Sequence, residues 1–294
     1  MVRSIALLSL IAACNSDYEL KGDGESAAGL PGEDLPLADT AEPEPEPEPE
    51  PEVDPDAPVA VCSVTPDIIR PITESANFLG SESYDPAGLE LDYDWKLVDR
   101  PVGSTATMPS GTGADRYGFT ADLAGEYVAE LTVTNTAGIA SEPCEAILTA
   151  EPIEALWVEM FWESPGDDMD LHLLAPGGTP RTDSDCYYAN CTGTWGGGLD
   201  WGVIGDTSDN PSLDLDDIPL TGPENINIDV PEDAVYTVFV HDYPGSVYTA
   251  GNPVTVNIYL DGSLQWTDTR VISGEDSDTY FATIDVAAGT VTSL

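Results

Sequence analysis

Acidic side chains are concentrated in a short segment, residues 167–172, in the second half of the chain. This segment reads Asp-Asp-Met-Asp-Leu-His. If it forms a β-strand, Asp168, Asp170 and His172 project from one face, because successive side chains alternate, and Leu171 projects from the other. Carboxylates held this closely repel one another unless water or a cation neutralises them. The segment therefore predicts either a solvated acidic surface or a cation site.

A second acidic segment, residues 209–217, is followed by Gly222-Pro223-Glu224. Calcium takes about six to eight oxygen ligands from carboxylates and carbonyls, so it suits such a site, and extracellular fluid supplies it. The segment is not an EF-hand loop. Counting from Asp214 places Pro219 where that loop needs glycine, and Asn225 where it needs glutamate. A solvated acidic loop is the alternative. The predicted calcium ligands are Asp168, Asp170, Asp214, Asp216 and Glu224.

The two histidines suggest a different chemistry. His241 is followed by Asp242, and such a pair can supply a general base and the acid that orients it. The sequence has neither a G-x-S-x-G nucleophile elbow nor an H-E-x-x-H helix, and each histidine lies in a strand-like pattern. We therefore expect a protein that is not an enzyme, with a secreted hydrolase as the less favoured alternative.

Aromatic residues in turn-rich segments suggest a third function. On the loops of a β-sandwich such rings can stack on sugars, which would make the protein a carbohydrate-binding surface module. The favoured interpretation is that they anchor the loops to the core of their own domain. The candidate stacking residues are Trp195 and Trp201, with Tyr187, Tyr188, Tyr243 and Tyr248 nearby in sequence.

The first fourteen residues predict export. A short basic start at Arg3 is followed by an apolar run that is too short to span a bilayer, as in the core of a signal peptide. Ile11-Ala12-Ala13-Cys14 resembles the bacterial lipobox, which implies a signal peptide over residues 1–13 and an acylated Cys14. In that family an aspartate after the cysteine is the signal for retention in the inner membrane, so Asn15 at this position favours the outer membrane. The predicted contact with the membrane is made through the lipid on Cys14. An ordinary signal peptide with an incidental cysteine is the alternative.

Four cysteines remain after Cys14, and exported chains meet an oxidising compartment, so disulfides are expected. Three pairings are open to four cysteines. We favour the two that each fall within one predicted domain, Cys62–Cys144 and Cys186–Cys191. A zinc site is the alternative, but the chain has no C-x-x-C pair and few histidines.

Composition separates a stalk from the folded part. Residues 14–56 are acidic and rich in proline, with Glu-Pro repeated from Glu42, so we expect a disordered, extended spacer. The formal net charge of the whole chain is -47, which excludes nucleic-acid binding because phosphate backbones would be repelled.

Beyond the stalk, apolar residues recur with a period of two, and clusters such as Asp261-Gly262 signal tight turns between strands. The predicted fold class is all-β, with two sandwich domains at residues 57–151 and 154–290. The strongest alternation is that of Leu91, Tyr93, Trp95 and Leu97, of Tyr127, Ala129, Leu131 and Val133, of Ile226, Ile228 and Val230, and of Val235, Thr237, Phe239 and His241.

The first of these domains resembles the PKD (polycystic kidney disease) family. The motifs are Ser-Tyr-Asp-Pro-Ala-Gly at 83–88, Leu-Asp-Tyr-Asp-Trp at 91–95 and Asp-Leu-Ala-Gly-Glu-Tyr at 122–127. The resemblance implies an immunoglobulin-like sandwich with Trp95 in its core. It also implies that Cys62 and Cys144 lie on neighbouring first and last strands. Members of the family are mostly spacer or adhesion modules with no shared catalytic site.

The second domain resembles an uncharacterised family of exported bacterial β-domains. The shared outline is D-x-D-L-H at 168–172, an aspartate-rich loop, G-P-E at 222–224 and a late strand that ends at His241. This implies an extracellular sandwich, jelly-roll-like or related, more than an activity. The sequence as a whole thus predicts a lipid-anchored envelope protein that presents a calcium-stabilised sandwich to an extracellular protein or glycan.

Overall fold

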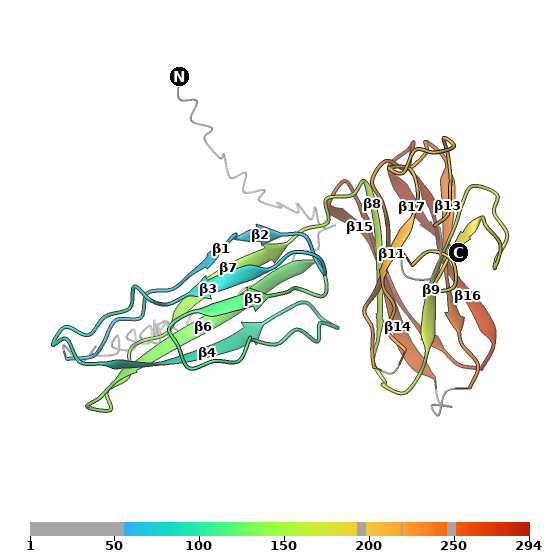
Figure 1. Ribbon diagram of the computed structural model, residues 1–294. Helices are drawn as coiled ribbons and strands as arrows, with labels where there is room; N and C mark the ends of the chain where they lie inside the picture. The colour runs from blue at the N-terminus through green and yellow to red at the C-terminus, as the bar shows by residue number, and fades with distance from the viewer. Residues whose placement is uncertain (1–55, 193–197, 219, 246–250) are drawn as a thin grey trace, which may run out of the picture. The chain divides into compact units, whose positions relative to one another are not determined.

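The computed structural model describes residues 56–192, 198–218, 220–245 and 251–294 (Figure 1). Every regular element in these ranges is a β-strand, so the predicted all-β class is confirmed. No helix in them is long and apolar enough to cross a membrane. Residues from 56 onward belong to one compact unit. The predicted signal peptide, Cys14, the stalk up to residue 55, Trp195 and Tyr248 lie outside the described residues.

Strands β1 to β7 form two sheets. The order in one is β1-β3-β5, and the order in the other is β2-β7-β6-β4; β2 pairs parallel with β7 and the remaining pairs are antiparallel. The strands are β1 (Ser63–Thr65), β2 (Ile68–Ile69), β3 (Ala76–Leu79), β4 (Leu91–Asp99), β5 (Arg116–Phe119), β6 (Gly125–Asn135) and β7 (Cys144–Ala150).

The alternation seen in the sequence builds the core of these two sheets. The side chains of β6 from Tyr127 to Val133 are buried at every second position, and on β4 Trp95 is buried while Asp94 and Lys96 are exposed. The indole Nε1 of Trp95 donates to the carbonyl of Ala114 at 2.8 Å, which satisfies the one polar atom that this ring brings into the core.

A disulfide joins the two sheets. Cys62 directly precedes β1 and Cys144 begins β7, and the two are bonded. A second disulfide, Cys186–Cys191, closes a short loop in the other half of the chain. Both favoured pairings are therefore present.

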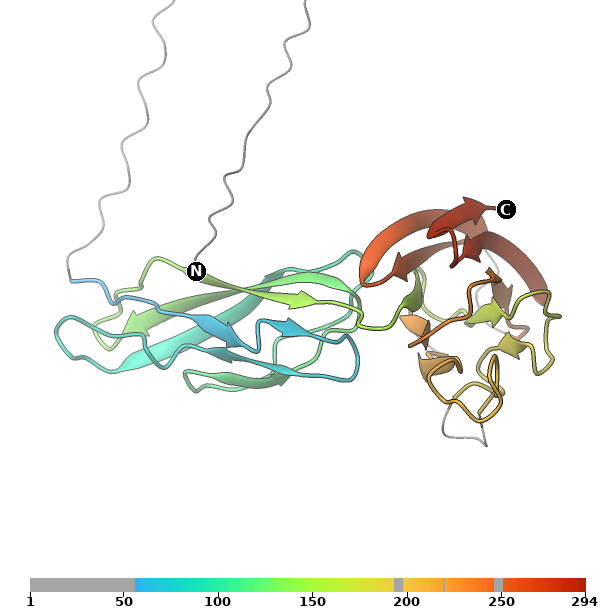
Figure 2. The same cartoon turned by 90° about the horizontal axis from the view of Figure 1, so that it is seen from above.

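Strands β8 to β17 form two five-stranded sheets, which Figure 2 views nearly end on. One has the order β10-β9-β13-β16-β17 and the other β11-β12-β8-β14-β15, and every pair is antiparallel. The strands are β8 (Leu156–Trp162), β9 (Met169–Leu174), β10 (Asp185–Cys186), β11 (Ser212–Leu215), β12 (Glu224–Ile228), β13 (Val235–Asp242), β14 (Asn252–Leu260), β15 (Ser263–Ile272), β16 (Ser277–Asp285) and β17 (Thr290–Ser293).

The turn signal at Asp261-Gly262 joins β14 to β15, as predicted. Both residues have positive φ, 47° and 74°, as a two-residue hairpin turn of this type requires. The predicted alternation through Val230 is wrong at its end. β12 stops at Ile228, and Val230, which precedes a proline, is 59% exposed.

Strand β13 is buried on both faces, which simple alternation does not predict. Tyr236, Val238 and Val240 pack in the core between the two sheets. Phe239 and His241 lie on the opposite face and are buried as well, because the chain around Arg181 and Tyr187 contacts that face. This second buried layer positions the candidate site.

The two disulfides should contribute unequally to stability. In the chain-entropy description, a bond that spans 82 residues restricts the unfolded chain more than one that spans 5. We expect Cys62→Ala with Cys144→Ala to lower the unfolding free energy by about 4 kcal/mol, and Cys186→Ala with Cys191→Ala by about 2 kcal/mol. Denaturant unfolding under oxidising conditions measures both. If the two double variants lose the same unfolding free energy, or if the Cys186 and Cys191 variant loses more, then strain or local packing and not loop closure sets the difference.

Candidate metal centre

Strand β9 carries residues 169–172 of the first acidic segment, and Asp167 and Asp168 directly precede the strand. Leu171 and Leu173 point into the core between the sheets, so Asp170 and His172 lie on the opposite face, as the alternation predicts. The register of the sheet places Asp170 opposite His241 of β13, and His241 opposite Asp278 of β16. Side chains opposite one another on a sheet face are within contact distance, so this row is set by strand pairing alone.

The structure brings three of the predicted calcium ligands together. Asp170, Asp216 and Glu224 each offer a carboxylate oxygen, and these atoms lie within 4.8 Å of one another. Asp170 comes from β9, Asp216 directly follows β11, and Glu224 begins β12. Asp170 and Glu224 are buried and Asp216 is exposed. We call these three residues the carboxylate triad.

Glu224 connects the two sheets at this point. Its Oε2 accepts a hydrogen bond of 2.8 Å from the backbone N–H of Leu171, which belongs to the other sheet. Its Oε1 accepts a longer bond of 3.4 Å from the backbone N–H of Asp217. The side chain is therefore fixed on both oxygens although it is fully buried.

The triad is electrostatically unfavourable by itself. Burial, followed by the charges of Asp168 and Asp216, raises the pKa of Asp170 to about 8. Burial and the charge of Asp170 raise the pKa of Glu224 well above its usual value. Oδ2 of Asp170 is also buried without a hydrogen-bond partner among the described residues. Charged oxygens in this state are costly unless a proton or a cation neutralises them.

Asp168 lies beside the triad. Its side chain is half-buried, and burial together with the charges of Asp216 and Asp167 raises its pKa to about 6. Its Oδ1 is a second buried oxygen with no partner in the described part of the chain. Asp168 is therefore placed to add a fourth carboxylate to the group.

Asp214 is the predicted ligand that the structure does not bring into the triad. Its carboxylate accepts hydrogen bonds from Arg70 at 2.8 Å, from Ser212 at 2.9 Å and from Asn227 at 3.1 Å. Asp214 lies on β11, whereas Asp216 follows the end of this strand at Leu215 and belongs to the triad.

A pocket of about 220 Å³ adjoins the triad on the same sheet face. His172 forms its inner wall, with its ring stacked between Phe239 at 4.3 Å and Tyr187 at 4.8 Å, measured between ring centroids. We call it the tyrosine pocket; it is lined by His172, Arg181, Tyr187, Tyr188, His241, Tyr243, Pro244 and Asp276.

His172 is neutral and fixed in one orientation. Its Nδ1 lies 2.8 Å from Oδ2 of Asp185, and burial lowers the pKa of the imidazole. The neutral ring donates Nδ1–H to Asp185, which leaves Nε2 as an acceptor. That Nε2 is buried and has no partner among the described residues.

The structure does not support the pairing of His241 with Asp242 as base and orienting acid. The two are neighbours on β13, so their side chains leave opposite faces of the sheet. Nδ1 of His241 instead lies 2.8 Å from Asp278 and 2.7 Å from Arg181. Arg181 was missed by sequence reasoning, since an isolated arginine in a turn carries no periodic signal.

Trp201 is packed against the core and is not presented to solvent. It is 8% exposed, its Nε1 donates to the carbonyl of Asp183 at 2.8 Å, and its ring packs against Tyr236. This residue therefore fits the favoured interpretation, in which the loop aromatics anchor the loops to the core of their own domain. Trp195, the other candidate, lies outside the described residues.

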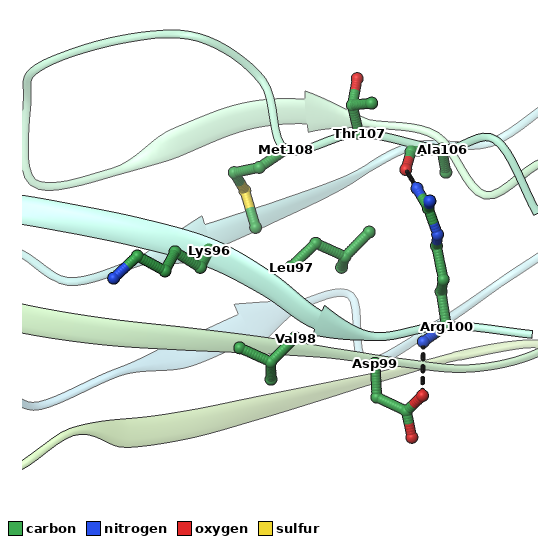
Figure 3. A pocket seen from close by; sticks show the side chains of 8 residues that line it. All are labelled: Lys96, Leu97, Val98, Asp99, Arg100, Ala106, Thr107 and Met108. Atoms are coloured by element: carbon green, nitrogen blue, oxygen red, sulfur yellow. Dashed lines mark hydrogen bonds between the residues drawn. The ribbon is translucent and has the colours of Figure 1, made fainter.

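A larger cavity of about 580 Å³ lies elsewhere, along the end of β4 (Figure 3). Its lining mixes apolar side chains, among them Leu97 and Met108, with charges of both signs, Asp99 and Arg100. The guanidinium of Arg100 donates to the carbonyl of Ala106. None of the predicted ligands lines it, so the triad and the tyrosine pocket are the better candidates for function.

No protein-family model matches this chain, and none of the curated proteins matches it. The assignment of function therefore depends on the geometry of the site.

The raised pKa values predict how the metal-free protein responds to pH. A carboxyl group that keeps its proton to about pH 8 when folded, but loses it near pH 4 when unfolded, makes folding less favourable as the pH rises between those values. In the presence of a chelator, the unfolding free energy should therefore fall from pH 5 to pH 8. Asp170→Asn should reduce this fall by at least about 1.4 kcal/mol, the value of one pKa unit. Identical pH slopes for the variant and the natural chain, measured by urea denaturation, would contradict the assignment.

Proposed function

We propose that residues 154–290 are a non-enzymatic binding module stabilised by calcium at the carboxylate triad. One observation carries the proposal. Carboxylate oxygens from three separate elements lie within 4.8 Å of one another, and two of the three side chains are buried. A cation at this point would offset the burial and the charge repulsion that together raise the pKa of Asp170 and Glu224.

The donor set favours a hard cation. All three side chains of the triad and the adjacent Asp168 offer oxygen, which suits calcium, whereas zinc, copper and nickel prefer sites with imidazole or thiolate. Asp170 and Glu224 would bind from the two sheets, so the ion would also hold β9 against β12. Backbone carbonyls and water would supply the remaining ligands of a calcium ion.

The location is proposed from the N-terminal sequence. Acylation of Cys14 would tether the chain to the envelope, with the outer membrane favoured, and the acidic stalk would space the sheets from it. Two disulfides are consistent with an oxidising compartment. The PKD-like residues 57–151 would act as a spacer or adhesion module.

The two alternative functions have less support. The carbohydrate-binding hypothesis rested on six loop aromatics, with Trp195 and Trp201 as the candidate stacking residues. Trp201 is packed in the core, and Trp195 lies outside the described residues. The hydrolase hypothesis depended on His241 with Asp242, whose side chains leave opposite faces of β13.

Calcium should raise the thermal stability of the full chain. A ligand at about 100 times its dissociation constant stabilises the folded state by about 2.7 kcal/mol, which shifts the unfolding midpoint upward by several degrees. We expect this shift on adding calcium to chelator-treated protein, and its loss in Asp216→Asn. Asp216 is exposed, so this variant should fold without the ion.

Asp229→Asn is the matched control, because it removes the same charge from an exposed aspartate just beyond the other end of β12. It should keep the calcium response. An unchanged midpoint in the natural chain, at calcium concentrations up to the millimolar level of extracellular fluid, would remove the calcium proposal.

The anchor has a separate test. Cys14→Ala should abolish incorporation of a labelled fatty acid in a bacterial host and release the protein from the membrane fraction. Cys62→Ala, which changes a cysteine in the folded part, is the control and should stay acylated. Membrane association that persists in Cys14→Ala without label would show that the lipobox resemblance is incidental.

A further inference from the structure

The tyrosine pocket has a geometry that suits a small cation. Its aromatic rings stand nearly perpendicular to one another: Tyr187 and Tyr188 at 88°, Tyr188 and Tyr243 at 84°, and Tyr243 and His241 at 90°. These rings line the pocket, and the π-face of a tyrosine attracts an ammonium group. Burial and a hydrogen bond with Tyr243 raise the pKa of Tyr188 to about 12, so this ring is the neutral phenol.

The charges around the pocket also favour a cation. Asp276 lines it and is 78% exposed. Arg181 is the one cationic side chain in the lining, and its two terminal nitrogens already donate to Asp278 at 3.1 and 2.6 Å. An anionic ligand would meet the carboxylate of Asp276, while the guanidinium of Arg181 is already engaged.

A third observation concerns hydrogen bonding. His172 is 1% exposed and lines the pocket with its Nε2 unpartnered among the described residues. Its Nδ1 lies 2.8 Å from Oδ2 of Asp185, so this contact fixes the orientation of the ring at the inner wall of the pocket.

We propose that the tyrosine pocket binds a primary organic ammonium group, such as the end of a lysine side chain or a free alkylamine. The volume of about 220 Å³ is below the roughly 300–1,000 Å³ of pockets for drug-sized ligands, so it accommodates the ammonium and its adjoining methylenes rather than a whole larger molecule. This deepens the proposed binding role by giving it a ligand class. It needs no ion at the triad.

The test uses the full chain and Nα-acetyl-lysine amide as the probe, with binding followed by calorimetry or NMR. Nα-acetyl-norleucine amide has a similar chain without the charge, hexanoate reverses the charge, and a panel of neutral monosaccharides covers sugar binding. We expect the lysine derivative alone to bind, and its binding to weaken as salt is raised. Equal binding of the norleucine derivative, or binding of a sugar in place of the amine, would overturn the proposal.

Variants separate the pocket from the triad. Tyr188→Ala and Asp276→Asn should each weaken amine binding on the order of fivefold, because each removes one attraction for the cation. Tyr84→Ala, at a tyrosine that is 55% exposed and outside the pocket, is the matched control and should bind normally. Thermal unfolding of every variant identifies any that fails to fold.

Asp216→Asn should lose the calcium response and keep amine binding, whereas Tyr188→Ala should do the reverse. A chain that binds the amine in chelator but is not stabilised by calcium would refute the proposed metal centre and leave the ammonium pocket standing. A chain that is stabilised by calcium but does not bind the amine would refute only the ammonium pocket.

Discussion

The buried carboxylate of Glu224 is the constraint on which this end of the C-terminal sheets depends. It starts β12, yet it accepts a hydrogen bond from Leu171 on a strand of the other sheet. The same carboxylate shares its surroundings with Asp170 and Asp216. The hydrogen bond from Leu171 to Glu224, which joins the two sheets, therefore lies in surroundings that disfavour the charged form of Glu224. Neutralisation of this group, by a proton or by the proposed ion, would therefore favour the contact between the two sheets.

Strand register places both candidate sites on one surface. On the outer face of β9, β13 and β16, one row contains Asp170, His241 and Asp278, and the next contains His172 and Phe239. The triad begins at the first row, and the aromatic wall of the pocket stands on the second. A shift of one residue in the register would turn every one of these side chains into the core. The two sites are consequently separate in chemistry but share one scaffold.

The sequence predicted those structural features that depend on residues close together in the chain. The strand faces of β4, β6 and β9, the hairpin at Asp261-Gly262 and both disulfide pairings follow from alternation, turn chemistry and domain membership. It did not predict the second buried layer over β13, because that layer depends on where a long connection lies. Arg181 was missed for the same reason, because its partners Asp278 and His241 are distant in the chain. Asp214 was chosen by its position in the acidic segment, and position alone did not show that its carboxylate contacts Arg70 and lies outside the triad.

The large acidic excess of the chain does not by itself make a selective site. A formal charge of -47 attracts cations to the whole surface, and most of that attraction is screened by salt. Selectivity needs oxygens whose separation is fixed and whose water has been removed. Asp170 and Glu224 meet this condition. Strand pairing holds Asp170 in place, and two hydrogen bonds hold the carboxylate of Glu224. Asp276, which is exposed, can increase attraction but cannot discriminate. In the proposed metal centre, the specific chemistry therefore falls to the few buried carboxylates, while the many exposed carboxylates contribute only a general attraction for cations.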